Sequence, residues 1–191
     1  LDRDTSGVLL FAKNENAHRL LSIDFEHRKI QKHYLAFVKG EPPATEGIID
    51  IPLHKARKGK MRQAKPHEKN SLSSSTYYHL EKTWKTSFGD VSLLKVSPKT
   101  GRQHQIRVHL KYIGNPLLID PIYSQKIFIK SSSQNNHDNA LLCKRLTLHS
   151  HRIEFIDPFT QKNVTFQAKF ADDMQKLYNA LERNVALEIS K

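Results

Sequence analysis

Strand-length segments, some continuously apolar and others alternating between apolar and polar residues, are separated by turn residues and most constrain how this chain folds. They lie at residues 7–13, 33–38, 47–52, 77–83, 91–97, 146–155 and 164–168. Gly, Pro, Ser and Asp residues between the runs favour turns. The runs do not alternate regularly with helical segments, as the strands of a parallel βαβ sheet would. The sequence therefore predicts an α+β fold, a single domain with a mixed, largely antiparallel central sheet flanked by helices.

Three segments have the spacing of helices. Asn14 is a suitable N-cap for a helix that ends near Arg28. A second helix is expected over residues 103–112, and a third over residues 172–183, which carries an apolar stripe. Residues 125–139 are polar and of low complexity, and we expect them to form a mobile insertion.

The charge of the chain favours a polyanionic partner. Lys and Arg number 31 against 19 Asp and Glu, a net charge of +12. Such an excess attracts nucleic acid, although it also serves solubility alone. The charge is concentrated at residues 54–69, where the basic residues are Lys55, Arg57, Lys58, Lys60, Arg62, Lys65 and Lys69. This basic segment is either a flexible arm that contacts phosphates or a solvated loop.

Several classes of protein are disfavoured by what the sequence lacks. Cys143 is the single cysteine, so it has no partner for an internal disulfide, and no HExxH or Cys/His cluster predicts a metal site. No apolar run approaches the ~20 residues of a membrane span, and no signal peptide is visible. We expect a cytoplasmic protein without membrane association or bound metal. The first residue is not Met, so Leu1 is not expected to be the natural start.

Two segments place polar groups where packing alone would not select them. In LDRDTSG (residues 1–7), Asp2 precedes a tight turn into an apolar run, although a turn-forming aspartate would look the same. In QKHYLAFVKG (residues 31–40), Tyr34 alternates with apolar neighbours and could equally be a core tyrosine.

The third such segment, residues 98–120, is the most informative. Polar residues crowd one short predicted helix, namely Arg102, His104, Gln105, Arg107 and His109. Arg107 stands between Ile106 and Val108, where the helix should enter the core. A buried arginine needs an anionic partner, either from the protein or from a ligand. A structural salt bridge and a functional site both remain open on this segment alone.

Taken together, four segments resemble the RluA-type RNA pseudouridine synthase family. LDRDTSGVLLFAK resembles the family's HRLDxxTSG signature, and KHYLAFVKG resembles its tyrosine-bearing motif. SPKTGRQHQIRVHLKYIGNPLLID resembles TGRxHQIRVHxxxxGxPLxGD, with Ile119 in place of the usual Gly, and LTLHSHRIEFIDP resembles a later strand and turn. The resemblance covers the chain in order. It implies a pseudouridine synthase fold, with residues 1–191 forming a catalytic domain that lacks its N-terminal part.

The resemblance also implies roles for individual residues. Asp2 matches the catalytic aspartate, Tyr34 the tyrosine that packs on the target base, and Arg107 the arginine that pairs with the aspartate. Arg102, His104 and Gln105 match the remaining polar positions, and we expect them to contact RNA. The implied activity is the isomerisation of uridine to pseudouridine in structured ribosomal or transfer RNA, by base flipping and without a cofactor. We expect a monomer.

Two other classes of function compete with this interpretation. A non-catalytic RNA-binding module on the same scaffold would bind RNA without isomerising it. Asp2 and Asp4 also suggest a carboxylate-based nuclease or glycosidase, but no further acidic cluster that would hold Mg²⁺ accompanies them. The enzymatic interpretation further predicts that Arg107 lies within salt-bridge distance of Asp2. It also predicts that Lys55, Arg57, Lys58, Lys60 and Arg62 contact RNA phosphates.

Overall fold

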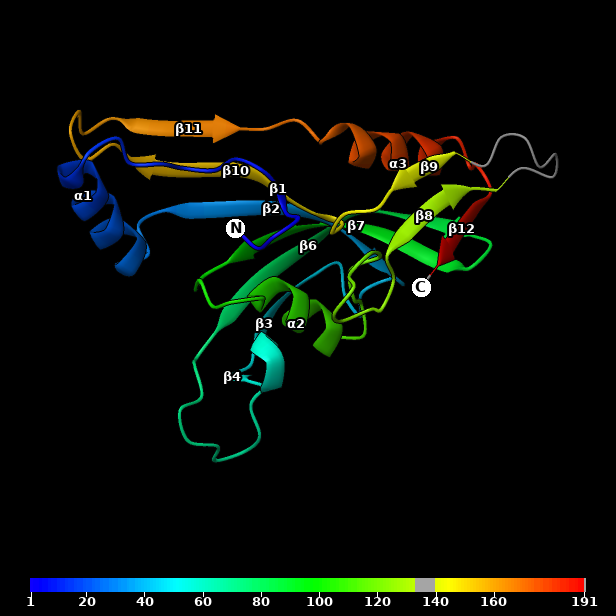
Figure 1. The fold of residues 1–191 in the computed structure, drawn as a ribbon, viewed down its shortest axis with the longest axis horizontal. Helices are drawn as coiled ribbons and strands as arrows, with labels where there is room; N and C mark the ends of the chain where they lie inside the picture. The colour runs from blue at the N-terminus through cyan, green and yellow to red at the C-terminus, as the bar shows by residue number, and fades with distance from the viewer. Residues whose placement is uncertain (133–139, 191) are drawn as a thin grey trace.

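The computed structural model describes residues 1–132 and 140–190, which are built around one long seven-stranded sheet (Figure 1). The strands lie in the order β1-β10-β2-β7-β6-β3, and β11 also pairs with β10. Their bounds are β1 (Ser6–Gly7), β2 (Gln31–Lys39), β3 (Glu46–Asp50), β6 (Ser75–Thr86), β7 (Gly89–Pro98), β10 (Leu148–Ile156) and β11 (Asn163–Gln167). Among these described strands only β1 and β10 are parallel. The predicted α+β fold with a mixed, largely antiparallel sheet is confirmed.

Both faces of the sheet are covered, and β2 in its centre has apolar residues on both sides. Ala36 and Val38 belong to the core on one face, whereas Leu35 and Phe37 pack into the core on the other. Successive side chains of a strand point to opposite faces, so a doubly covered strand is apolar at nearly every position. This explains why the sequence is continuously apolar from Tyr34 to Val38.

Each face of the sheet has its own helix. The first face is covered by α2 (Gln105–Tyr112), whose Ile106, Val108 and Leu110 enter the core. The second is covered by α3 (Asp172–Glu182) through Met174 and Leu177. A small sheet also borders the second core, formed by β8 (Phe128–Ser131), β9 (Leu141–Cys143) and β12 (Leu187–Ser190). None of the helices in the described residues is long and apolar enough to cross a membrane.

Helix α1 (Glu15–Glu26) lies at the end of the sheet where β10 turns into β11 (Figure 1). The side chain of Asn14 accepts a hydrogen bond from the backbone N–H of Ala17 at 2.9 Å, which is the predicted N-cap. The helix ends two residues before the predicted Arg28.

The strand predicted at residues 7–13 is wrong beyond Gly7. Strand β10 has two edges, and β2 occupies one of them. On the other edge β1 pairs only with His149 and Ser150, because β11 takes the stretch from Arg152 onward. Residues 8–13 therefore have no edge to join. The short parallel contact is reinforced by a hydrogen bond of 2.8 Å between Ser6 Oγ and His149 Nδ1.

The basic segment is also more ordered than predicted. It contains a hairpin of β4 (Leu53–Lys55) and β5 (Met61–Gln63), with a 3₁₀ turn at Arg57–Gly59 between them. Leu53 and Met61 are 0% and 4% exposed, so these two apolar residues anchor the hairpin in the core. The prediction of a flexible arm is wrong for this part.

The expected insertion at residues 125–139 is described only in part. Its residues Phe128–Ser131 form strand β8, a strand that the polar composition of the segment does not predict and that pairs with β9 and β12. Ile129 is fully buried and provides the apolar contact that holds this strand. Residues 133–139 lie outside the described residues.

Candidate active site

Asp2 is positioned by the close approach of β1 to β10. The backbone N–H of Thr5 donates to the carbonyl of Asp2 at 3.1 Å, which closes a turn just before β1. Gly7 has φ +113°, and a Cβ at this position would lie 2.1 Å from the carbonyl oxygen of Ser150. Only glycine fits such a conformation and such a contact. The Thr-Ser-Gly sequence thus fixes where the chain leaves the sheet, and with it the place of Asp2.

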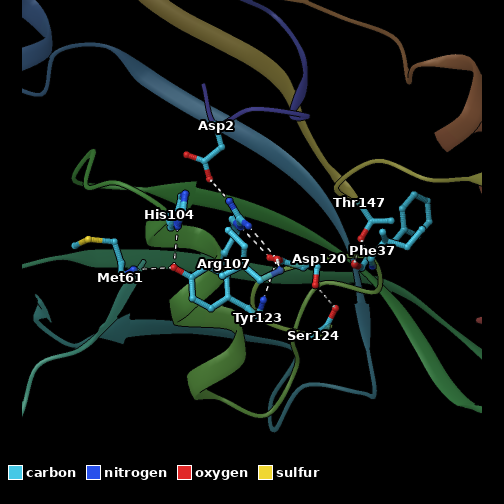
Figure 2. A network of polar contacts seen from close by, with 11 residues as sticks. Asp2, Phe37, Met61, His104, Arg107, Asp120, Tyr123, Ser124 and Thr147 are labelled. Carbon is cyan, nitrogen blue, oxygen red and sulfur yellow. Dashed lines mark hydrogen bonds and ion pairs between the residues drawn. The ribbon is translucent and has the colours of Figure 1, made fainter. Parts of the chain in front are cut away.

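The guanidinium of Arg107 joins Asp2 to a second carboxylate, that of Asp120 (Figure 2). Its Nε and Nη2 donate to Asp120 at 2.8 and 2.9 Å, and its Nη1 donates to Asp2 Oδ2 at 3.1 Å. The side chains of Arg107 and Asp120 are 4% and 1% exposed, and that of Asp2 is 22% exposed. The predicted ion pair between Arg107 and Asp2 is confirmed.

Asp120 is the better anchored of the two carboxylates. Its Oδ1 also accepts from the backbone N–H groups of Ile122 and Tyr123, at 2.8 and 3.0 Å. Burial alone would lower the pKa of Arg107, but the hydrogen bonds and charges of Asp120 and Asp2 outweigh it and raise that pKa. Arg107 is therefore a permanent cation that Asp120 holds in place and whose Nη1 is directed at Asp2.

Asp2 and Tyr34 line one pocket of about 260 Å³. Other residues in its wall are Thr5, Lys32, Thr100, Gly101, Arg102, His104 and Gln105. The volume is just below the roughly 300–1,000 Å³ of small-molecule sites, so the pocket suits a single nucleotide base. Burial raises the pKa of Tyr34, as does the charge of Asp2, while a hydrogen bond with Ser150 opposes them. The phenol is thus neutral at physiological pH.

His104 stands at the N-terminus of α2 in a left-handed conformation, with φ 53°. Its Nδ1 lies 2.8 Å from the hydroxyl of Tyr123, which also accepts from the backbone N–H of Met61 at 2.9 Å (Figure 2). Burial, followed by the charge of Arg107, lowers the pKa of His104, so its imidazole is neutral at pH 7. A strained backbone beside a pocket is common at functional sites.

Tyr123 and Asp120 are the site residues that sequence reasoning missed. The ring centroid of Tyr123 lies 5.0 Å from Cζ of Arg107, a cation–π contact in addition to the hydrogen bond with His104. Tyr123 lies just beyond the motif at residues 98–120, and no sequence pattern marks it as a site residue. Asp120 was inside the motif, and the need of Arg107 for an anion could have pointed to it.

The predicted RNA contacts in this segment fall into two groups. Gln105 is buried, and its Oε1 accepts from Thr100 Oγ1 and the backbone N–H of Arg102, at 2.6 and 3.0 Å. Its Nε2 donates to the carbonyl of Ser75 and to Thr76 Oγ1. The amide is thus used within the protein, and Gln105 is better described as a positioning residue. Arg102 also lines the pocket, as does His104, and neither side chain has all of its polar atoms bonded within the part of the chain that the structure describes.

The basic segment is divided in the same way. Arg62 donates to Glu68 at 2.7 Å, and this hydrogen bond holds the pKa of Glu68 at about 2. The other four cations that were predicted to contact RNA are exposed and form no ion pair within the described residues, namely Lys55, Arg57, Lys58 and Lys60. Gln103, which lines the pocket, donates to the carbonyl of Gly59 at 3.4 Å. The tip of the hairpin therefore lies beside the pocket.

Candidate metal ligands are not grouped in the part of the chain that the structure describes. Within residues 1–132 and 140–190, no three His, Cys, Asp or Glu side chains come together in a way that could hold a metal ion.

Comparisons with solved structures agree with this architecture. The chain superposes on human RNA Pseudouridylate Synthase Domain Containing 4 with a TM-score of 0.69 and 22% sequence identity, over 100% of this chain and 76% of that one. Human RNA Pseudouridylate Synthase Domain Containing 1 gives a TM-score of 0.70 over 97% of this chain and 79% of that one, also at 22% identity. At this level of identity the likeness establishes the fold.

Comparisons of sequence extend to closer relatives. The chain is 37% identical to tRNA pseudouridine synthase C of Haemophilus ducreyi, over 94% of this chain and 74% of that protein. It is 33% identical to ribosomal large subunit pseudouridine synthase D of Zymomonas mobilis, over 95% of this chain and 54% of that protein. The chain thus spans about half to three quarters of the length of these relatives. The model of the RNA pseudouridylate synthase family matches residues 1–112, which hold Asp2, Tyr34 and Arg107. The chain belongs to the RNA pseudouridylate synthase family.

Proposed function

We propose that the protein containing this chain isomerises uridine to pseudouridine in ribosomal or transfer RNA. The observation that carries the proposal is the Asp2 carboxylate, which lines a base-sized pocket together with Tyr34 and is held by Arg107. The names of the relatives, which specify the ribosomal large subunit and tRNA, support these two classes of RNA. Asp2, Tyr34 and Arg107 are the proposed catalytic residues, on a catalytic domain formed by residues 1–191.

The proposed reaction exchanges one glycosidic bond for another. The N1–C1′ bond breaks, the base rotates, and a C5–C1′ bond forms, while C5 loses a proton and N1 gains one. No electrons or external groups enter the balance. An ionised carboxylate can attack C1′, stabilise the charge that develops there, or assist deprotonation of the sugar. All three routes need a carboxylate at a fixed distance and direction from the ribose.

The contact of Arg107 with both Asp2 and Asp120 provides this fixed distance and direction. Asp120 takes two N–H groups of the guanidinium in a bidentate pair and compensates most of its charge. Asp2 receives an N–H of Nη1 at 3.1 Å, so its direction is set while its charge is left for the substrate. Two carboxylates around one arginine leave the group with a net charge of −1. The group of Asp2, Arg107 and Asp120 therefore favours the positive charge that develops at C1′.

Tyr34 and the exposed cations of the β4–β5 hairpin explain how the base can be held outside its stack. Extruding a uridine from its stack costs a few kcal/mol. Stacking on the phenol of Tyr34 returns about 1–3 kcal/mol of that cost. The cations at the tip of the hairpin, beside the pocket, are suited to hold the RNA backbone while the base is out.

The test is release of tritium from RNA labelled at C5 of uridine, with the full-length protein. The wild type should release tritium, and Asp2→Asn should release none while binding the same RNA within about threefold, since one partly exposed carboxylate is removed from a large interface. Binding by the wild type without any release would instead identify an RNA-binding module. Release by Asp2→Asn at the wild-type rate would refute the assignment of Asp2.

We further propose that the protein acts in the cytoplasm and as a monomer. Cys143 is buried, and burial raises the pKa of its thiol to about 12. Such a thiol is unreactive, and its reduced state suits a reducing compartment. Size-exclusion chromatography with light scattering would check the oligomeric state.

A further inference from the structure

A second cavity, of about 410 Å³, adjoins the pocket of Asp2 and Tyr34. The two share a wall made of Lys32, Arg102 and the turn at Thr100 and Gly101. A Cβ at Gly101 would lie 3.5 Å from Nζ of Lys32, so the ammonium rests directly against the backbone of this turn. We refer to this second space as the Lys32 cavity.

The Lys32 cavity is lined by four cations, Arg28, Lys32, Lys99 and Arg102, and by a single acid, Glu26. None of the four cations forms an ion pair with a carboxylate in the described residues. Arg102 donates its Nε to the carbonyl of Ser73 at 3.2 Å, which leaves its Nη groups for a ligand. The cavity therefore has an excess of positive charge that the protein does not compensate.

Lys32 is the most constrained of these cations. Burial lowers its pKa, and the ring of Phe25 lies 5.9 Å from its Nζ. A partly buried ammonium without a carboxylate is unfavourable unless an anion from outside pairs with it. The other three cations stand around the same space, so such an anion would be held by several donors.

The position of Lys32 relative to Tyr34 indicates which anion this is. The two residues are two apart on β2, so their side chains leave the same face of the sheet. Their Cα atoms are separated by about 7 Å, the rise of two residues in a strand. That is about the span of one nucleotide, so a ligand whose base stacks on Tyr34 brings its own backbone to Lys32.

We propose that the Lys32 cavity binds the RNA backbone phosphate that adjoins the target uridine. This inference rests on the proposed function, because the neighbouring pocket must hold the extruded base. Bound there, the phosphate fixes the ribose between Lys32 and Asp2, so the cavity sets the register of the RNA at the site. Arg102, in the shared wall, contacts the same nucleotide from the side of the turn.

The first experiment measures binding of a uridine-containing single-stranded oligonucleotide at several salt concentrations. Lys32→Gln should reduce the slope of log K against log salt, by at most the value of about 0.7 for one phosphate contact on a single strand, because the other three cations of the cavity remain. Lys99→Gln, on an exposed side chain, should do the same without risk to folding. Lys162→Gln removes an exposed lysine outside both cavities and should leave the slope unchanged. Wild-type slopes in both cavity variants would overturn the inference.

The second experiment locates the phosphate. One methylphosphonate linkage, which is uncharged, replaces the phosphate on either side of the target uridine in the RNA that the full-length protein modifies. One of the two replacements should weaken RNA binding by the wild type but not by Lys32→Gln. If Lys32 did not contact that phosphate, the losses of binding free energy from the linkage and from the substitution would instead add. If the wild type released no tritium from RNA without a replaced linkage, the proposed function would be refuted. Normal tritium release together with additive losses of binding would refute only the proposed phosphate site in the Lys32 cavity.

Discussion

At the scale of single residues, the division of N–H groups on Arg107 decides what each carboxylate does. The carboxylate of Asp120 is buried, takes two N–H groups and accepts from two backbone amides. The carboxylate of Asp2 is partly exposed and takes one N–H. The first arrangement is costly to break and the second leaves an anion accessible. Stability and reactivity are thus assigned to different carboxylates of the same cluster.

Replacing Asp120 tests this assignment. Asp120→Asn leaves the buried guanidinium without its bidentate partner, so we expect the free energy of unfolding to fall by about 3–5 kcal/mol. Arg107 should also turn toward Asp2 and remove its free charge, so tritium release by the folded fraction should fall. Urea unfolding and single-turnover release at saturating RNA measure the two effects. Asp2→Asn is the matched control, and an equal loss of stability in both variants would contradict the division of roles.

At the scale of elements, strand β1 positions the site although it has only two residues. Gly7→Ala would drive a Cβ into the carbonyl of Ser150, so β1 should leave β10 and Asp2 should lose its place. We expect at least a roughly tenfold loss of tritium release and faster exchange of the Val8 amide, which donates to Ser150 at 2.8 Å.

A matched control for Gly7 exists at Gly89. Gly89 has φ +109°, and no atom of the described residues lies within 4 Å of the place that a Cβ would take, so Gly89→Ala adds backbone strain without a clash. It should cost stability but leave the release rate of folded protein unchanged. An equal loss of rate in both alanine variants would mean that strain alone, and not the contact of β1 with β10, explains the effect.

The hairpin β4–β5 gives a second prediction for an element. Lys55, Lys58 and Lys60 are exposed, so replacing all three with Gln should weaken binding of different RNAs by similar factors. The salt slope should fall by about 2 on single strands, from about 0.7 for each contact. Arg62→Gln removes a cation already paired with Glu68 and should change the slope less. An unchanged slope in the triple variant would identify the hairpin as a solvated loop.

The elements also mark how far local sequence determines the fold and the site. Strands β2, β6, β7 and β10 and all three helices were predicted to within about three residues, because periodicity and turn residues are local signals. Residues 8–13 were mispredicted because β11 competes for the same edge of β10, and this competition is tertiary. The need of Arg107 for an anionic partner followed from the cost of burying a charge. The role of Tyr123 did not follow, because nothing in its sequence neighbourhood marks a hydroxyl that bonds both His104 and Met61.

At the scale of the whole molecule, buried histidines couple stability to pH. His109 is fully buried, its Nε2 lies 3.0 Å from Ser74 Oγ, and its Nδ1 has no partner in the described residues. Burial lowers its pKa to about 4. The unfolded chain, with a histidine pKa of about 6.5, binds this proton first, so stability is present above pH 6.5 and is lost as the pH falls toward 4.

We expect His109 to account for a loss on the order of 3 kcal/mol across that window. Urea unfolding at about pH 7 and about pH 5 measures most of it, and His109→Gln should flatten the difference. His67→Gln, on an exposed side chain, should leave the difference as in the wild type. If His109→Gln retained the full difference, the pH dependence would belong to other groups, of which His104 and His149 also have pKa values lowered by burial.

The parallel contact of β1 with β10 determines when the site can form during synthesis of the chain. Ser6 and His149, which hold this contact, are 143 residues apart. A ribosome adding about 5–20 residues per second needs roughly 7–30 s to make that stretch. During this time the first residues of the chain have emerged but have no β10 to join, and pairing across such a separation is slow even afterwards. Asp2 is therefore synthesised well before the strand that positions it, so the proposed site stays incomplete until β10 has been made.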